Sequence, residues 1–207
     1  MILKLEGDMT DEFLDLLAKA HNECPHDESL TIYFSSDGGD LSVMEAIVDL
    51  INNSEKIDVI KAYGSLFSGG FYIPMFVKKP VEFLDYSVGM IHTAWFPSAP
   101  IYGNKEIHKH AKEMYEEMML SGEELVKRVE KLKILNKTEL KRFKNNEDVF
   151  LSVHRLREMR EIVWKDIVKE YEQAVEEWQE SIKEEETLED LLEQQEELQK
   201  RIKQKLK

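Results

Sequence analysis

The first 92 residues alternate between short apolar runs and longer stretches in which apolar residues recur every three or four positions. Apolar runs with β-branched residues predict strands, here at residues 2–5, 30–34, 57–60, 81–84 and 88–91. Helical spacing predicts one helix after Thr10 and a second over residues 41–52. Strands and helices that alternate through short connections favour an α/β fold with a parallel sheet.

The stretch Ile57–Met75 combines an apolar run, a turn of small residues at 64–70 and a second apolar segment. This pattern is typical of a buried strand that leads through a tight turn into a buried helix. A serine in such a turn, here Ser68, lies near the first backbone amides of the helix, where negative charge is stabilised. We therefore consider Ser68 a candidate nucleophile, and the alternative is that it only caps the helix.

The second half of the chain has a helical pattern. Two prolines in residues 95–103 indicate a loop, residues 105–129 are strongly helical, and residues 131–145 continue as helix or helix-turn-helix. From Ser152 onward the chain contains neither glycine nor proline, and apolar residues recur at helical spacing as far as Ile182.

Thr187 and Asp190 predict a capping box for a last helix, although Gln195 and Lys205 interrupt its apolar seam. We expect a charged helical or coiled-coil extension, at residues 152–207, after an α/β domain at residues 1–151. The extension is either an arm for assembly or partner binding, or a solvated helix.

The composition indicates an acidic, soluble protein. The 207 residues carry a net charge of −14, which argues against a broad surface for nucleic acid or anionic membranes. The single cysteine, Cys24, cannot form an internal disulfide, and no apolar run is long enough to cross a bilayer. We expect a cytoplasmic protein that binds neither nucleic acid nor membrane and needs no metal or other cofactor.

Polar groups follow three of the predicted strands. They lie in Ser-Ser-Asp-Gly-Gly-Asp at residues 35–40, Leu-Phe-Ser-Gly-Gly at 66–70 and Met-Ile-His at 90–92. The carboxyl ends of parallel strands meet at one edge of a sheet, where ligands usually bind. We therefore expect these three segments to lie close together.

Together the candidate residues supply what acyl transfer to serine requires. The hydroxyl of Ser68 needs a base such as His92. The imidazole needs a carboxylate, here Asp148, to hold its tautomer and stabilise its protonated form. Backbone amides of Gly39 and Gly69 are candidate donors to the tetrahedral intermediate, and one missing donor typically costs about 2.7–4 kcal/mol of barrier.

Each candidate taken singly also has a structural explanation. Asp40 is the expected cap of the helix after the Gly38-Gly39 turn. A lone histidine such as His92 is more often a packed core or edge residue than a base. Asp148 by itself reads as a carboxylate at the entry of a helix. Only the combination favours chemistry over packing.

The same segments resemble the proteolytic subunit of the Clp protease. That family has a Ser-Pro-Gly-Gly turn, a Gly-x-Ala-Ser-Met-Gly turn with the nucleophile, a Met-Ile-His-Gln-Pro strand end and a catalytic aspartate shortly before Phe-Met/Leu-Ser. This chain has, in the same order, Ser36-Asp37-Gly38-Gly39, Gly64-Ser65-Leu66-Phe67-Ser68-Gly69-Gly70, Met90-Ile91-His92-Thr93-Ala94 and Glu147-Asp148-Val149-Phe150-Leu151-Ser152. Residues 83–87, which precede the histidine segment, also resemble the family's segment at that place. The resemblance covers roughly residues 2–152.

The resemblance implies a ClpP/crotonase-like ββα spiral with a helical handle at about residues 105–135 that mediates assembly. It implies a serine endopeptidase with Ser68 as nucleophile, His92 as general base and Asp148 as the orienting acid, together with the two glycine donors. Members of the family form homo-oligomeric rings, many of which complete their active sites only on assembly. They cleave unfolded polypeptides in a closed chamber, usually fed by an ATP-driven AAA+ unfoldase.

The chain departs from the family at several positions. Gly69 replaces a methionine, Asp37 replaces a proline, and Thr93 and Ala94 replace the Gln-Pro pair. Two other functions stay open. One is a crotonase-type acyl-CoA enzyme, in which the glycine turns bind a thioester oxyanion and no Ser-His pair is needed. The other is a catalytically inactive scaffold whose tail recruits partners.

Overall fold

The computed structural model describes residues 1–93, 120 and 122–205, with side chains described as far as residue 181. The loop expected at 95–103 and most of the expected handle at 105–135 lie outside these residues. The chain divides into two compact units, Met1–Trp164 and Lys165–Lys207. Each unit is considered by itself.

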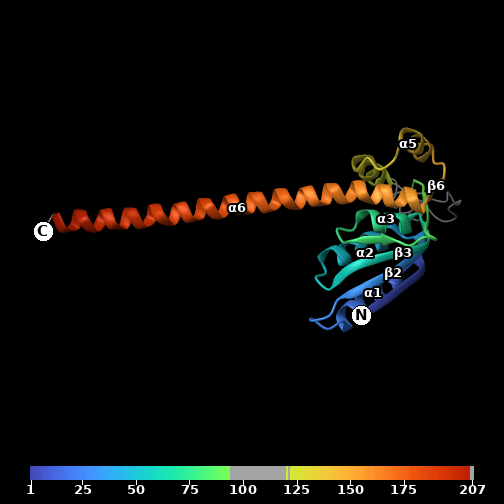
Figure 1. Cartoon of the computed structure of the whole chain (residues 1–207), viewed down its shortest axis with the longest axis horizontal. Coiled ribbons are helices and arrows are strands. Elements are labelled where there is room, and N and C mark those ends of the chain that lie inside the picture. The colour runs from blue at the N-terminus through green and yellow to red at the C-terminus, as the bar shows by residue number, and fades with distance from the viewer. Residues whose placement is uncertain (94–119, 121, 206–207) are drawn as a thin grey trace, which may run out of the picture. The chain divides into compact units, whose positions relative to one another are not determined.

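The first unit is built on one mixed sheet of six strands (Figure 1). Five strands lie side by side in the order β1 (Ile2–Met9), β2 (Leu30–Gly39), β3 (Ile57–Phe67), β5 (Val88–Ile91) and β6 (Val149–Ser152). The short strand β4 (Val81–Phe83) pairs with the first half of β3. Pairs among β1 to β5 are parallel, which confirms the predicted α/β class, whereas β6 runs antiparallel to β5 and was not predicted.

Three helices connect the first strands: α1 (Asp11–Glu23), α2 (Leu41–Asn53) and α3 (Gly69–Phe76). Helices α1 and α3 contact the strands, and α2 packs against both of these helices. The core lies between these helices and the sheet, because alternate residues of β2 (Leu30, Ile32 and Phe34) are buried. Phe13 of α1 meets Phe34 edge to face, with ring centroids 6.0 Å apart. Such pairs stabilise a fold by about 0.5–1.5 kcal/mol in addition to the stabilisation from the area that they bury.

Strands β2 and β3 extend beyond the turns that the sequence predicted. The expected turn at 35–40 is strand as far as Gly39, and the expected turn at 64–70 is strand as far as Phe67. Both strands absorb their small residues as irregularities, since the register shifts between Phe34 and Ser36, and Gly64 has φ 59°. Pairing then resumes between the two buried residues Ser36 and Leu66.

Residues 122–132 are helical and lead through a turn into α5 (Lys137–Lys144), so the second alternative predicted for this region, a helix-turn-helix, is confirmed. A capping box begins α5. The Asn136 side chain accepts from the amides of Thr138 and Glu139, and Glu139 accepts from the Asn136 amide.

The last helix, α6 (Val153–Lys205), is continuous, coloured orange to red in Figure 1. The predicted helix start at Thr187 is therefore wrong, because the good helix formers around it carry the helix through the potential cap. Leu156, Met159 and Val163 are buried, so the first turns of α6 belong to the core of the first unit, beyond residue 151. None of the helices in the described residues is long and apolar enough to span a membrane.

We predict that Leu156→Ala lowers the free energy of unfolding by about 2–5 kcal/mol, because it leaves a cavity in the core. Leu156 is 0% exposed, and a Cβ placed on Gly89 of β5 would lie 2.6 Å from its Cδ2 atom. Chemical denaturation of the full chain measures the change. The matched control is Ile162→Ala on the same helix, where 37% of the side chain is exposed and the loss should be below about 1.5 kcal/mol. Equal losses would show that the start of α6 is not part of the core.

Candidate active site

Ser68 is the single residue between the end of β3 and the start of α3. Its backbone has φ 52° and ψ −123°, a conformation that costs a residue with a Cβ about 1–3 kcal/mol. The Ser68 amide donates to the carbonyl of Met90 on β5 at 2.8 Å, which fixes the turn against the neighbouring strand. A serine on a sharp, strained strand-to-helix turn presents its hydroxyl outward, as in a nucleophile elbow.

The alternative role of Ser68, as a helix cap, is not supported by its contacts. Ser68 stands at the N-cap position of α3, but its hydroxyl makes no capping hydrogen bond. Asp40, by contrast, is the cap of α2 that the sequence predicted, because its carboxylate accepts hydrogen bonds from the amides of Ser42 and Val43. A hydrogen bond from the Ser42 hydroxyl also lowers the pKa of Asp40, which keeps the cap charged.

The end of β2 at Gly38-Gly39 and the start of α3 at Gly69 meet beside Ser68. A Cβ placed on Gly38 would lie 2.7 Å from the Cβ of Ser68 and 3.3 Å from the nitrogen of Gly69. A Cβ placed on Gly69 would lie 3.7 Å from the nitrogen of Gly39 and 2.1 Å from the Cε of Met9. The Gly39 and Gly69 amides predicted as oxyanion donors are therefore neighbours. A side chain on Gly69 would collide with Met9, and one on Gly38 would collide with Ser68, so both positions favour glycine.

His92 follows β5 directly and is half-buried. The parallel register pairs Phe67 of β3 with Met90 of β5, so the chain leaves both strands at the same edge, at Ser68 and at His92. This is the convergence of strand ends that the sequence predicted for these two residues.

Asp148 directly precedes β6, whose Val149 pairs with Ile91 in the antiparallel register. Asp148 therefore stands across from His92 where the β5–β6 pair opens. A hydrogen bond between the side chains of Thr93 and Asn146 joins the same two segments one step further on. The carbonyl of Asp148 accepts from Arg142 Nη2 at 2.7 Å, and the residue is exposed.

The structure thus brings the backbones of all five predicted site residues to one edge of the sheet. Within the described residues of this single chain, no hydrogen bond joins the Ser68 hydroxyl, the His92 imidazole and the Asp148 carboxylate. The ends of β3, β5 and β6 supply the three residues, so the proton relay forms only if their side chains adopt rotamers that face one another.

Tyr72 is a further residue of this edge, and sequence reasoning missed it. Its hydroxyl lies on α3, one turn after Ser68, and donates to the carbonyl of His92 at 2.8 Å. Burial raises the pKa of Tyr72 well above its usual range, so the hydroxyl stays protonated and remains a donor. The signal in the sequence is one hydroxyl inside the otherwise apolar segment Gly69–Phe76.

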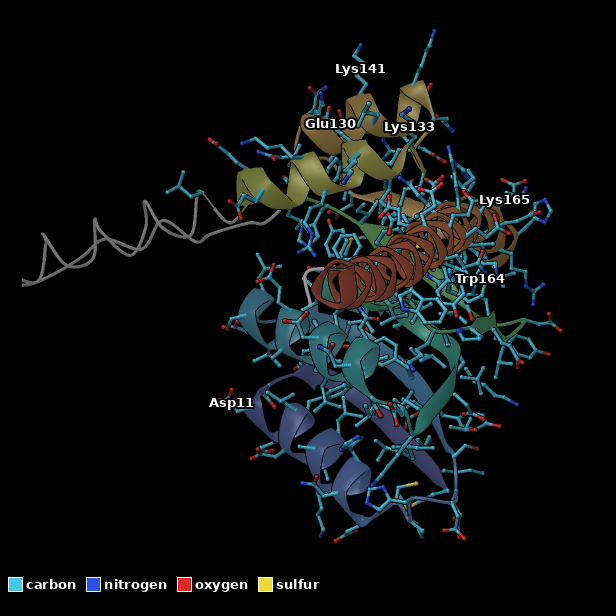
Figure 2. All side chains as sticks on the ribbon, turned by 90° about the vertical axis from the view of Figure 1, so that its left-hand side faces the viewer. Asp11, Glu130, Lys133, Lys141, Trp164 and Lys165 are labelled. Atoms are coloured by element: carbon cyan, nitrogen blue, oxygen red, sulfur yellow. The ribbon has the colours of Figure 1, made fainter. Side chains whose placement is uncertain are left out.

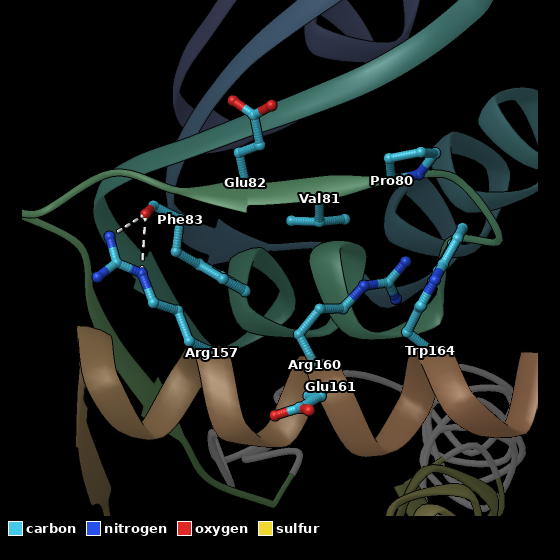
Figure 3. Close-up of a pocket in the computed structure, with 8 residues that line it drawn as sticks. All are labelled: Pro80, Val81, Glu82, Phe83, Arg157, Arg160, Glu161 and Trp164. Carbon is cyan, nitrogen blue, oxygen red and sulfur yellow. Dashed lines mark hydrogen bonds between the residues drawn. The ribbon is translucent and has the colours of Figure 1, made fainter.

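A groove of about 550 Å³ lies elsewhere, between β4 and the start of α6 (Figure 3). β4 pairs with residues 60–62 of β3, so the groove flanks the first half of that strand, whereas Ser68 follows its last residue. The Arg157 guanidinium donates to the carbonyl of Phe83 at its rim.

Arg160, buried beneath this groove, holds helix α3 from its end. Its guanidinium donates to the carbonyls of Met75 at 3.5 Å and Lys79 at 2.5 Å, and it lies 5.5 Å from the ring of Trp164. Burial lowers the pKa of Arg160 to about 10. A cation at the C-terminus of a helix is favourable, which gives Arg160 a structural role.

No protein-family model matches the sequence, and no curated protein matches it either. Among solved structures, a mutant of ClpP1 from Listeria monocytogenes is similar, with a TM-score of 0.54 at 19% sequence identity. The match covers 76% of this chain and 86% of that chain. The chain has a ClpP-like fold. At this level of identity the likeness of the ClpP-like chain concerns the fold alone.

We predict that Ser68→Gly is more stable than Ser68→Ala by about 1 kcal/mol, because glycine adopts the φ of 52° without strain and alanine does not. Thermal and chemical unfolding of both variants measure the difference. Ser65 of β3 has no positive φ and provides the control, since Ser65→Gly should be less stable than Ser65→Ala by about 0.5–1 kcal/mol. The same order of stability at both positions would mean that Ser68 carries no strain.

Proposed function

We propose that this protein is a serine endopeptidase that acts on unfolded polypeptides. The observation that carries the proposal is the backbone of Ser68, strained at φ 52° in a ClpP-like fold with no capping bond to explain the serine. Strained residues of this kind are typical of functional sites, because a glycine or an unstrained turn would otherwise connect β3 to α3 equally well.

In the proposed mechanism the Ser68 hydroxyl attacks the carbonyl carbon of the scissile peptide bond. His92 takes the hydroxyl proton and later gives it to the leaving amine. Asp148 accepts a hydrogen bond from the protonated imidazole and stabilises its charge. Water then enters, His92 again acts as the base, and hydrolysis of the acyl-enzyme regenerates the Ser68 hydroxyl.

The Gly39 and Gly69 amides are the proposed donors to the oxyanion of each tetrahedral intermediate. This role is supported by the close approach of the end of β2 to the start of α3, since the nitrogen of Gly39 lies 3.7 Å from the Cβ position of Gly69. Backbone donors fixed by a β-strand and a helix start are preorganised, so they need no reorganisation as charge develops.

We further propose that the active form is a homo-oligomer, by analogy with the ring-forming peptidases of this fold. Assembly offers a physical reason for the missing hydrogen bonds within one chain, because neighbouring copies can set side-chain rotamers at the exposed Asp148. An AAA+ unfoldase as partner is a weaker extension of the same analogy.

A catalytically inactive scaffold is the second candidate function. The observation that favours it is that, in the described part of the chain, neither His92 nor Asp148 has a side-chain hydrogen bond to the other or to Ser68. The crotonase-type acyl-CoA alternative gains no comparable support, because the strained serine has no role in that chemistry.

A fluorophosphonate probe separates these functions. We predict that the assembled chain is labelled and that Ser68→Ala and His92→Ala reduce labelling and casein hydrolysis by at least about 10³-fold. Asp148→Asn should reduce hydrolysis by about 10⁴-fold if the carboxylate orients the base as in other triads.

The control is Ser65→Ala, which changes a nearby serine of β3. This variant should be labelled as the unmodified chain is. Unlabelled protein whose mass in solution shows stable assembly would favour the scaffold.

We also predict that Tyr72→Phe slows hydrolysis while the free energy of unfolding falls by only about 0.5–1.5 kcal/mol. The variant loses the donor to the His92 carbonyl and keeps the ring that fills the core. A fall in kcat with KM little changed is expected of a residue that positions the base. An activity loss that merely follows the fraction unfolded would reduce Tyr72 to a packing role.

A further inference from the structure

Helix α6 carries an exposed apolar face within the second compact unit. Tyr171 is 71% exposed, Trp178 is 63% exposed and Val168 is 38% exposed, and Val175 lies between the two aromatic residues in sequence. These four residues, which we call the apolar stripe, are spaced by three, four and three positions. The spacing is that of the a and d positions of a heptad, so all four lie on one face of the helix.

Exposure of this kind is costly for a solitary helix. Large aromatic side chains bury 150–250 Å² each where they have a partner, and tryptophan and tyrosine are the residues that most often dominate binding energy. Ile167 and Ala174 border the stripe on one side and widen it. Large apolar patches on soluble proteins mark interaction sites.

The charge around the stripe is almost entirely negative. Residues 166–197 contain fourteen acidic and two basic residues, a net charge of −12 out of the −14 of the whole chain. Glu172 adjoins the stripe on one side, and Glu170 and Glu177 lie beyond Ile167 and Ala174 on the other. A helix that packs on the stripe and on these two apolar residues is therefore flanked by carboxylates on both sides.

We propose that the apolar stripe binds a basic amphipathic helix of another protein. An apolar seam would cover Tyr171 and Trp178, and lysine or arginine residues beside that seam would face the acidic borders. The proposal is independent of the serine chemistry, because it rests only on residues of the second unit.

A second copy of this tail is the competing occupant, and its charge disfavours it. Two parallel tails would place the acidic stretch 166–197 against itself along its whole length. In an antiparallel pair, the basic residues near 200–207 would reach only the start of the other tail, and the acidic middle would still face itself. Charge complementarity thus selects a basic partner.

The test uses the full chain and two synthetic helices of about four heptads, both with leucine at a and d. One probe has lysine at e and g, and the other has glutamate there. Isothermal titration calorimetry should show saturable binding of the lysine probe and none of the glutamate probe. Added salt should weaken the binding, because it screens the paired charges.

A double variant with unchanged net charge tests the stripe itself, and a variant on the opposite face of α6 that removes one acidic charge is the control. Tyr171→Gln combined with Trp178→Gln should weaken binding of the lysine probe at least about tenfold. Glu180→Gln, on the opposite face of α6, should change it by less than about twofold.

Three results would overturn the proposal. The first is equally tight binding to the double variant, which would mean attraction by charge alone. The second is self-association of the chain that strengthens with salt and is lost in the double variant, which would identify a second copy as the occupant. The third is binding of neither probe, which would leave a solvated helix.

Discussion

The left-handed backbone of Ser68 is the constraint on which the proposed catalytic edge depends. It is held from three sides: its amide is bound to Met90 of β5, helix α3 begins at the next residue, and Gly38 approaches so closely that a Cβ there would touch Ser68. A strained residue persists only where its surroundings determine its conformation in this way. Relaxing Ser68 would mean giving up contacts of two strands and a helix at once.

The rest of the first unit fixes this edge in register. Parallel pairing of β3 with β5 sets Ser68 beside the end of β5, and antiparallel pairing of β5 with β6 sets Asp148 across from His92. The start of α6, directly after β6, is buried in the same core, so packing far from the edge stabilises the pairing that forms it. The first unit ends at Trp164, which Figure 2 labels on α6.

The alternation of strands and helices could be predicted from periodicity, because buried faces repeat every two or every 3.6 residues. The candidate site could be predicted because polar residues after parallel strands gather at one edge. The full length of β2 and β3 could not, since their glycine and serine residues read as turns and pairing absorbs them as irregularities. β6 and the contact of Tyr72 with His92 depend on tertiary pairing that leaves no local pattern, and whether the three proposed catalytic side chains engage stays a prediction.

The rate at which a fluorophosphonate modifies Ser68, with and without the His92 imidazole, tests the central claim most directly. The account predicts a single adduct, located on Ser68 by peptide mass spectrometry. It should form at least about 10³-fold faster in the unmodified chain than in His92→Ala. An assembled protein in which Ser68 stays unmodified, or reacts at a rate that does not depend on His92, would contradict the account.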